Sequence, residues 1–111
     1  MQDCIFCKII SKEIPTTIIE ENDDVLVIQD LHPKAPVHYL IIPKKHIVNV
    51  KEMDQQDAVY TAKMMLIAQQ LSKNLSGDQS FRLIMNNGAG SGQSVFHMHM
   101  HFLSGKQMGD F

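Results

Sequence analysis

Short apolar runs separated by polar turns follow one another along the chain, and their length and composition predict five strands. Four of these runs are rich in β-branched and other large apolar side chains, and the last alternates histidine with methionine. Asparagine, aspartate and proline residues between the runs favour turns. We predict strands at 16–22 (TTIIEEN), 25–30 (VLVIQD), 37–43 (VHYLIIP), 80–86 (SFRLIMN) and 95–104 (VFHMHMHFLS).

Two other stretches repeat their apolar residues at helical spacing. The longer one covers residues 58–75 as a broad apolar stripe, with Asp54 as the expected N-cap and Asp57 as an acid of the first turn. Gly77 follows as the expected stop. The shorter helix is predicted in CIFCKIISK, residues 4–12.

The order of these elements is helix, three strands, long helix, two strands. Short links between successive strands favour antiparallel pairing. We therefore predict one α+β domain over residues 1–111. It contains a five-stranded antiparallel sheet with one long helix on one face and a short N-terminal helix.

Composition narrows the class of protein. A chain of 111 residues with 44% hydrophobic content suits one folded domain. No apolar run approaches the ~18–20 residues that a transmembrane helix needs. The net charge is −2 and the lysines are scattered, so we expect no nucleic-acid partner. The first residues carry no basic leader before an apolar run, and we expect a cytoplasmic protein with no membrane association.

The two cysteines, Cys4 and Cys7, form a C-x-x-C motif that has three interpretations. The motif can be half of a zinc site, a redox dithiol, or two small apolar residues of a short helix. A redox motif normally opens a helix just after a buried strand. Only three residues precede Cys4, so the redox interpretation is the weakest.

The stretch FHMHMHF carries three histidines at every second position. Residues two apart on a strand point the same way, so His97, His99 and His101 share one face. The opposite face is left to Met98, Met100 and Phe102, which we expect to pack under the long helix. A zinc bound by all three histidines is awkward, because the outer two lie ~13 Å apart along a strand. Nucleophilic or acid–base catalysis by imidazole fits better.

A glycine-rich loop, NNGAGSGQS at 86–94, stands directly before the histidines. Glycine permits backbone conformations that aim successive N–H groups at one anion. We expect the N–H groups of Gly92, Gln93 and Ser94 to lie near the first histidine. The loop lacks the Lys-Ser/Thr pair of a Walker motif, and a strand is predicted after it. Loop and histidines together favour a phosphate as the ligand.

The motif HMHMHFL resembles the His-φ-His-φ-His-φ-φ signature of the histidine triad (HIT) superfamily at every position. CIFCKIISKEIP, DLHPKAPVHYLIIPKKHI and RLIMNNGAGSGQSVFHMHMH, in this order, are similar to the Hint-type branch over essentially the whole chain. The resemblance implies the fold predicted above. It also implies a homodimer in which two protomers form a continuous ten-stranded sheet.

The resemblance also implies roles for single residues. His99 is similar to the nucleophile that attacks the α-phosphorus of a nucleotide and forms a nucleotidyl-histidine, which water then hydrolyses. His101 is similar to the residue that contacts the phosphate, and His38 to a family histidine near the triad that we count among the catalytic residues. Ser94 is similar to a residue that binds the α-phosphate and lies near the leaving group. The nucleotide-binding set that the resemblance and the loop imply is Ile5, Phe6, Ile9, Ile28, Asp30, Leu31, Asn86, Gly92, Gln93, Ser94, His99 and His101. Of these, Asp30 is expected at the ribose hydroxyls and the apolar residues around the base.

Some bacterial relatives hold a structural zinc with a C-x-x-C motif, a central histidine and the first histidine of the triad. The matching positions here are Cys4, Cys7, His46 and His97, a closed Cys₂His₂ set. The resemblance therefore implies one structural zinc per chain.

The expected function is hydrolysis of nucleoside 5′-monophosphate derivatives, such as phosphoramidates and acyl- or aminoacyl-nucleotides, at the α-phosphate. Purine nucleotides, derivatives of AMP or GMP, are the expected substrates. Two alternatives stay open: a dinucleoside polyphosphate hydrolase, and a non-catalytic purine nucleotide-binding or scaffold protein.

Overall fold

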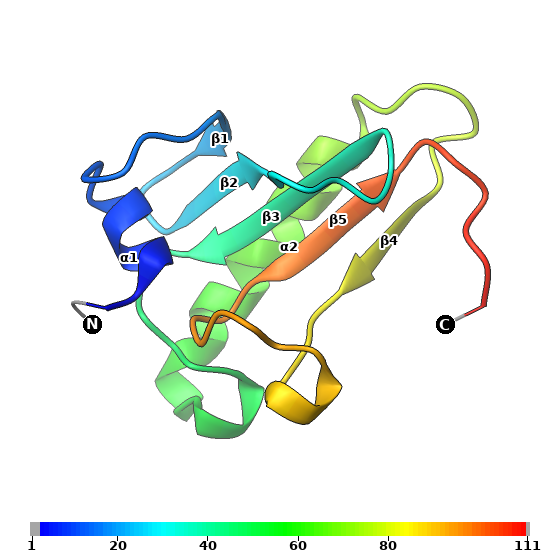
Figure 1. Ribbon diagram of the computed structural model, residues 1–111. Helices are drawn as coiled ribbons and strands as arrows, with labels where there is room; N and C mark the ends of the chain where they lie inside the picture. Colours follow the sequence, from blue (N-terminus) through cyan, green and yellow to red (C-terminus); the bar gives the residue numbers. More distant parts are fainter. Residues whose placement is uncertain (1–2, 111) are drawn as a thin grey trace.

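A computed structural model describes residues 3–110, in which five strands and two α-helices follow one another in the predicted order (Figure 1). Three short 3₁₀ turns, at Val50–Glu52, Gln55–Asp57 and Ala89–Ser91, complete the regular structure. In chain order the main elements are α1 (Ile5–Ile10), β1 (Ile18–Glu21), β2 (Val25–Gln29), β3 (Val37–Pro43), α2 (Ala58–Ser72), β4 (Phe81–Ile84) and β5 (Met100–Ser104).

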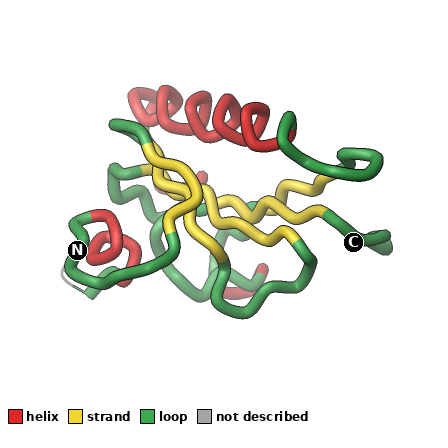
Figure 2. Tube along the Cα trace, turned by 90° about the horizontal axis from the view of Figure 1, so that it is seen from above, coloured by secondary structure: helices red, strands yellow, loops and turns green. Residues whose placement is uncertain are grey.

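The strands form one sheet in the order β1-β2-β3-β5-β4, and every neighbouring pair is antiparallel. The last strand of the chain therefore lies inside the sheet, and β4 forms one edge. Figure 2 shows α2 along one face of the sheet and α1 on the opposite side. The predicted α+β fold, with its five-stranded antiparallel sheet, one long helix and a short N-terminal helix, is confirmed.

Two apolar clusters hold this arrangement together, one on each face of the sheet. The α2-side core includes Met98, Met100 and Phe102 together with Met64 and Ile67 of α2. This confirms that the methionines between the histidines are core residues. The α1-side core contains Phe6, Ile9, Leu26, Ile28, Leu40 and Ile42.

The apolar run of β2 follows from these two cores. Residues 25–28 are all buried, with Val25 and Val27 in the α2-side core and Leu26 and Ile28 in the α1-side core. A strand covered on both faces has no polar side to alternate with. The run VLVI is therefore continuous because both faces are covered.

The start of α2 differs from the prediction in one detail. Asp54 stands before the 3₁₀ turn Gln55–Asp57, and the α-helix proper begins only at Ala58. The Asp57 carboxylate accepts a hydrogen bond from the Asp54 N–H at 3.0 Å and pairs with Lys45, whose ammonium lowers the pKa of this carboxyl. The helix ends at Ser72 rather than at residue 75, and Gly77 lies in a later turn with a φ of 68°.

The fifth strand is shorter than predicted. Only Met100–Ser104 pair with β3 and β4, so His97 and His99 precede the strand and His101 lies within it. Upstream of Met100 the main chain turns to another partner, because the Met98 N–H donates to the Ile47 carbonyl. Met98 and Met100 nonetheless both lie in the α2-side core, as the alternation predicts. Within residues 3–110, no helix is long and apolar enough to cross a membrane.

Gly105 is the glycine whose missing side chain the fold depends on most. Its φ is 101°, and a Cβ there would lie 2.9 Å from the Pro36 Cβ. We predict that Gly105→Ala lowers the free energy of unfolding by ~1–3 kcal/mol, through backbone strain and overpacking. Chemical denaturation measures this. Gly109→Ala is the matched control, because nothing lies within 4 Å of that position. Equal stability of the two variants would contradict the prediction.

Candidate functional site

A cavity of about 540 Å³ opens beside α1, on the face of the sheet opposite α2. It collects side chains from α1, the ends of β2 and β4, the glycine loop and the histidine segment. Almost every predicted nucleotide-binding residue lines it: Ile5, Phe6, Ile9, Ile28, Asp30, Leu31, Asn86, Gly92, Ser94, His99 and His101, together with His38. Gln93 does not, because its side chain is turned away and is 3% exposed.

His99 presents one particular nitrogen to this cavity. Its Nδ1 lies 2.8 Å from the main-chain carbonyl oxygen of His97. A carbonyl can only accept, so Nδ1 carries the proton and Nε2 keeps a free lone pair. Burial lowers the pKa of His99, which keeps the imidazole neutral. Phe6 packs edge-on against the same ring, with centroids 5.0 Å apart. A neutral imidazole held in this tautomer is a nucleophile.

His101 is oriented the other way by a chain of hydrogen bonds. The Lys34 main-chain N–H donates to His38 Nδ1 at 3.0 Å, so the proton of neutral His38 is on Nε2. That nitrogen lies 2.9 Å from His101 Nδ1, which must accept, and 3.3 Å from Asp30 Oδ2. His101 therefore carries its proton on Nε2. The chain turns His101 into a hydrogen-bond donor.

The same histidine stays uncharged. Burial lowers the pKa of His101 to about 4, and nearby His99, His38 and Lys34 act in the same direction, while Asp30 opposes them. Burial also lowers the pKa of His38. Near neutral pH both rings are therefore neutral, and their hydrogen-bond roles follow from the tautomers alone.

The glycine loop offers fewer free donors than the sequence predicts. The N–H groups of Gly92 and Gln93 donate to the carbonyls of Ala89 and Gly88, each at 3.1 Å. Gly92 has a φ of 105°, and its α-carbon faces the Asn86 side chain. Within residues 3–110, the Ser94 N–H and hydroxyl have no hydrogen-bond partner in the protein. Ser94 also lines the cavity, so it offers two free donors there.

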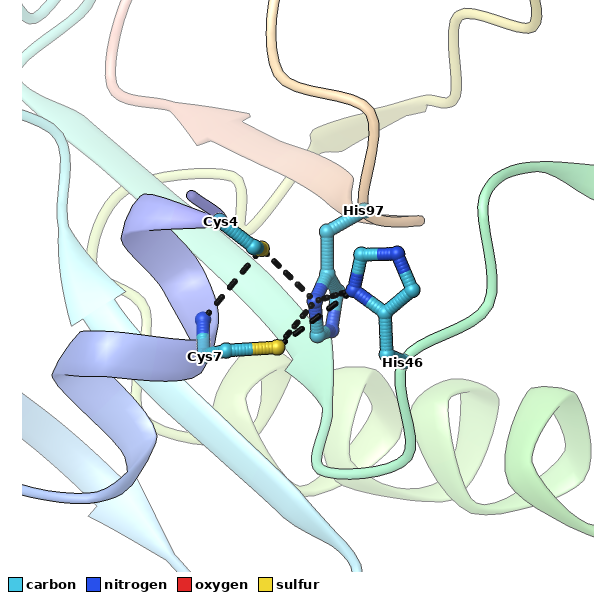
Figure 3. A group of neighbouring side chains, drawn as sticks. All are labelled: Cys4, Cys7, His46 and His97. Atoms are coloured by element: carbon cyan, nitrogen blue, oxygen red, sulfur yellow. Dashed lines mark hydrogen bonds between the residues drawn. The ribbon is translucent and has the colours of Figure 1, made fainter. Parts of the chain in front are cut away.

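A second constellation lies beside the cavity, where Cys4, Cys7, His46 and His97 converge (Figure 3). His97 Nδ1 lies 3.4 Å from Cys4 Sγ, 3.6 Å from Cys7 Sγ and 3.1 Å from His46 Nδ1. Cys7 Sγ is 3.4 Å from His46 Nδ1. The ligand atoms of a tetrahedral zinc, at ~2.0–2.3 Å from the metal, stand ~3.3–3.8 Å apart. The four side chains fit that ion.

The protonation states of His97 and Cys7 decide how this cluster can bind a metal. His97 Nε2 lies 2.8 Å from the Pro43 carbonyl, so it carries the proton and leaves Nδ1 free for a metal. Burial lowers the pKa of His97 to about 4. Burial and the neighbouring Cys4 raise the pKa of Cys7 to about 11, so metal binding there must release a proton. A raised thiol pKa is the opposite of what a redox dithiol requires.

Several residues around the cavity gave no signal in the sequence. Thr16 was predicted to lie in a strand. The strand β1 begins only at Ile18, and Thr16 lies before it and lines the cavity. Lys34 contributes through its main chain, which no side-chain pattern can indicate. The additional lining residues are Thr16, Gln29, His32, Lys34, Leu40, Ile84, Val95 and Leu103.

Comparison with known proteins gives the family. The family model described as HIT domain matches residues 11–108. An uncharacterized HIT-like protein of Synechocystis is 42% identical over 105 residues, which cover 95% of this chain and 92% of that protein. A solved structure titled HIT family hydrolase, from Clostridium thermocellum, superposes with a TM-score of 0.93 at 44% identity and covers 100% of this chain and 97% of that one. The chain belongs to the HIT family.

Another relative has a name that refers to zinc. A 14 kDa zinc-binding protein of Brassica juncea is 38% identical over 108 residues, which cover 96% of each chain.

We predict that the purified protein contains about one zinc per chain and that Cys4→Ser abolishes this stoichiometry, because a hydroxyl replaces a thiolate ligand. Elemental analysis by mass spectrometry measures the content. Chelation should lower the melting temperature of the wild type and leave that of Cys4→Ser unchanged. His32→Ala is the control and should keep its zinc, since His32 is no part of the cluster. Equal zinc in wild type and Cys4→Ser would contradict the assignment.

Proposed function

We propose that this protein is a nucleotide hydrolase that cleaves nucleoside 5′-monophosphate derivatives at the α-phosphate, through a nucleotidyl intermediate on His99. The observation that carries the proposal is the His99 tautomer. Its Nδ1 is occupied by the His97 carbonyl, which leaves a neutral Nε2 lone pair for the cavity. The match to a solved protein titled as a hydrolase supports the reaction class.

The cavity has regions suited to each part of such a substrate. Apolar side chains of α1 and β2, with Leu31 at the mouth, form a slot for a flat purine base. The Asp30 carboxylate can accept hydrogen bonds from ribose hydroxyls. Ser94, His101 and Asn86 line the end where His99 stands, and they can donate to phosphate oxygens.

The chemical step follows from these positions. The His99 Nε2 lone pair forms a bond to the α-phosphorus while the bond to the leaving group breaks. The departing atom takes a proton that the Ser94 hydroxyl or a water can relay. Negative charge on the nonbridging oxygens is stabilised by the His101 Nε2–H and the Ser94 donors. Water then attacks the phosphorus, releases the nucleoside monophosphate and returns the lone pair to His99.

The leaving group distinguishes this proposal from its alternatives. Phosphoramidates and acyl- or aminoacyl-nucleotides, derivatives of AMP or GMP, are the proposed substrates. A dinucleoside polyphosphate hydrolase would use the same nucleophile on a longer substrate. A non-catalytic purine nucleotide-binding or scaffold protein would bind nucleotides without turnover. The three differ in their rates with adenosine phosphoramidate and with a diadenosine polyphosphate.

Zinc has a structural role in this proposal. A Cys₂His₂ set fills all four positions of a tetrahedral ion, so no position remains for water. Bound zinc would fix α1 against the histidine segment through Cys4 and Cys7. Neither thiol forms a disulfide, which suits a reducing compartment, and we propose the cytoplasm as its location.

A homodimer of this single domain, residues 1–111, completes the proposal. The outer edge of β4 is unpaired within the described sheet, so a second copy can continue it to ten strands. Helix α2 exposes Val59, Met65 and Leu66, at 51%, 55% and 62%. Phe81 of β4, which stacks on Phe102 of the α2-side core, is 40% exposed. Exposed apolar side chains in this number favour a protein interface.

We predict that His99→Ala retains AMP binding but loses turnover by at least about a thousandfold, because no other lone pair replaces Nε2. Adenosine phosphoramidate and a diadenosine polyphosphate are assayed in parallel with wild type. Rapid quenching and mass spectrometry should find a nucleotidyl group on the His99 peptide of the wild type only. Free imidazole should restore part of the turnover of His99→Gly. Normal turnover in His99→Ala would refute the nucleophile, and wild-type inactivity on both substrates would favour the binding protein.

We predict that Leu66→Glu shifts the protein from dimer to monomer, because it places a charge in the exposed apolar face of α2. Sedimentation velocity measures the mass. Lys73→Glu, beyond the end of the same helix, is the control and should leave the dimer intact. A wild type that is monomeric at micromolar concentration would contradict the dimer.

A further inference from the structure

Gln93 is a buried polar side chain that the proposed reaction does not use. It is 3% exposed and lies between two residues, Gly92 and Ser94, that both line the cavity. A buried amide is costly unless its polar atoms are hydrogen-bonded. The partners of Gln93 therefore indicate what the side chain does.

Both polar atoms of the side chain are fully engaged. Oε1 accepts hydrogen bonds from the Gly88 N–H at 2.7 Å and from Asn49 Nδ2 at 3.3 Å. Nε2 donates to the Val48 carbonyl at 2.8 Å and to the Val95 carbonyl at 3.1 Å. A primary amide has two donor hydrogens and two acceptor lone pairs, and all are used here.

These partners tie the glycine loop to a distant part of the chain. Gly88 stands at the start of the loop and Val95 just after its end, whereas Val48 and Asn49 belong to the segment that follows β3. The Gln93 main-chain N–H closes the loop further by donating to the Gly88 carbonyl at 3.1 Å. A second tie runs from the Val50 N–H to Asn87 Oδ1 at 2.9 Å. Gln93 is the centre of this network.

A loop with glycine at 88, 90 and 92 needs such a tie. Glycine loses more conformational entropy on ordering than any other residue, so the loop has little intrinsic preference for one shape. Donors aimed at a developing charge contribute most when they are already in place and need no reorganisation.

We propose that Gln93 is a positioning residue, which acts through the loop to hold the Ser94 N–H and hydroxyl toward the α-phosphate of the bound nucleotide. This inference rests on the proposed function and deepens it. It replaces direct nucleotide contact, the role expected for Gln93 from the sequence, with action through its neighbour.

The positioning role predicts a change in nucleotide affinity that general destabilisation of the fold would not cause. The base slot is formed by residues of α1 and β2. The Gln93 side chain makes no hydrogen bond to either element in the described part of the chain. Disordering the loop therefore weakens binding of the phosphate and leaves binding of the nucleoside intact. The ratio of AMP affinity to adenosine affinity therefore separates a loss of phosphate binding from a general loss of nucleotide binding.

The test uses Gln93→Met in the full chain, which keeps the length of the side chain and removes its hydrogen bonds. Titration calorimetry measures AMP and adenosine binding to zinc-loaded wild type and variant. The expected result is a loss of about tenfold in AMP affinity, with adenosine affinity unchanged. Gln93→Asn, which keeps the amide but shortens its reach, should give a smaller loss of the same kind. It replaces the Met variant if that variant unfolds at the assay temperature.

Ser104→Ala is the matched control. Ser104 is also buried, and its hydroxyl donates to the Ser80 carbonyl, but it does not line the cavity. It should lower the melting temperature without changing the affinity ratio. Equal loss of AMP and adenosine affinity in the Gln93 variants, or no loss, would overturn the positioning role. A wild type that binds AMP no better than adenosine would instead count against the proposed function itself.

Discussion

The main-chain and side-chain bonds of His97 are the constraint on which the site depends. Its carbonyl accepts a hydrogen bond from His99 Nδ1, and its Nε2 donates to the Pro43 carbonyl at the end of β3. Its Nδ1 faces the thiols of Cys7 in α1 and of Cys4 at the N-cap of that helix. One residue therefore joins the sheet, the N-terminal helix and the nucleophile. His97 lies before the start of β5 at Met100, so no strand partner competes for the carbonyl that His99 uses.

The cavity exists because the two faces of the sheet are covered unequally. On one face α2, with 15 residues, spans the strands and closes a core of large apolar side chains. On the other face α1 has 6 residues, a length of ~9 Å, and covers only part of the sheet. The uncovered part of the sheet becomes the floor of the site. The short helix buries Phe6 and Ile9 in the α1-side core, and the proposed zinc would add a second attachment through Cys4 and Cys7.

The elements were predictable because they depend on local patterns. Alternation placed the methionines in the core and the histidines on the site side, although only His101 lies in a strand. The late start of β5, the anchoring of Gln93 and the hydrogen bond from the Lys34 amide were not predictable. Each depends on a main-chain group, which leaves no mark in residue type: the Met98 N–H pairs with the distant Ile47 carbonyl, Gln93 binds the distant Val48 carbonyl, and the Lys34 N–H pairs with His38 four residues away.

The hydrogen bond from the Lys34 amide has a consequence for how this site can vary in evolution or design. The tautomer of His101 is set through His38 by a peptide N–H, and nineteen of the twenty standard residues possess that group. Position 34 can therefore accept almost any side chain, basic, acidic or apolar, without changing which nitrogen of His101 donates. Proline alone removes the proton at the head of the chain. A position that looks freely variable in an alignment can thus carry an absolute constraint on one residue.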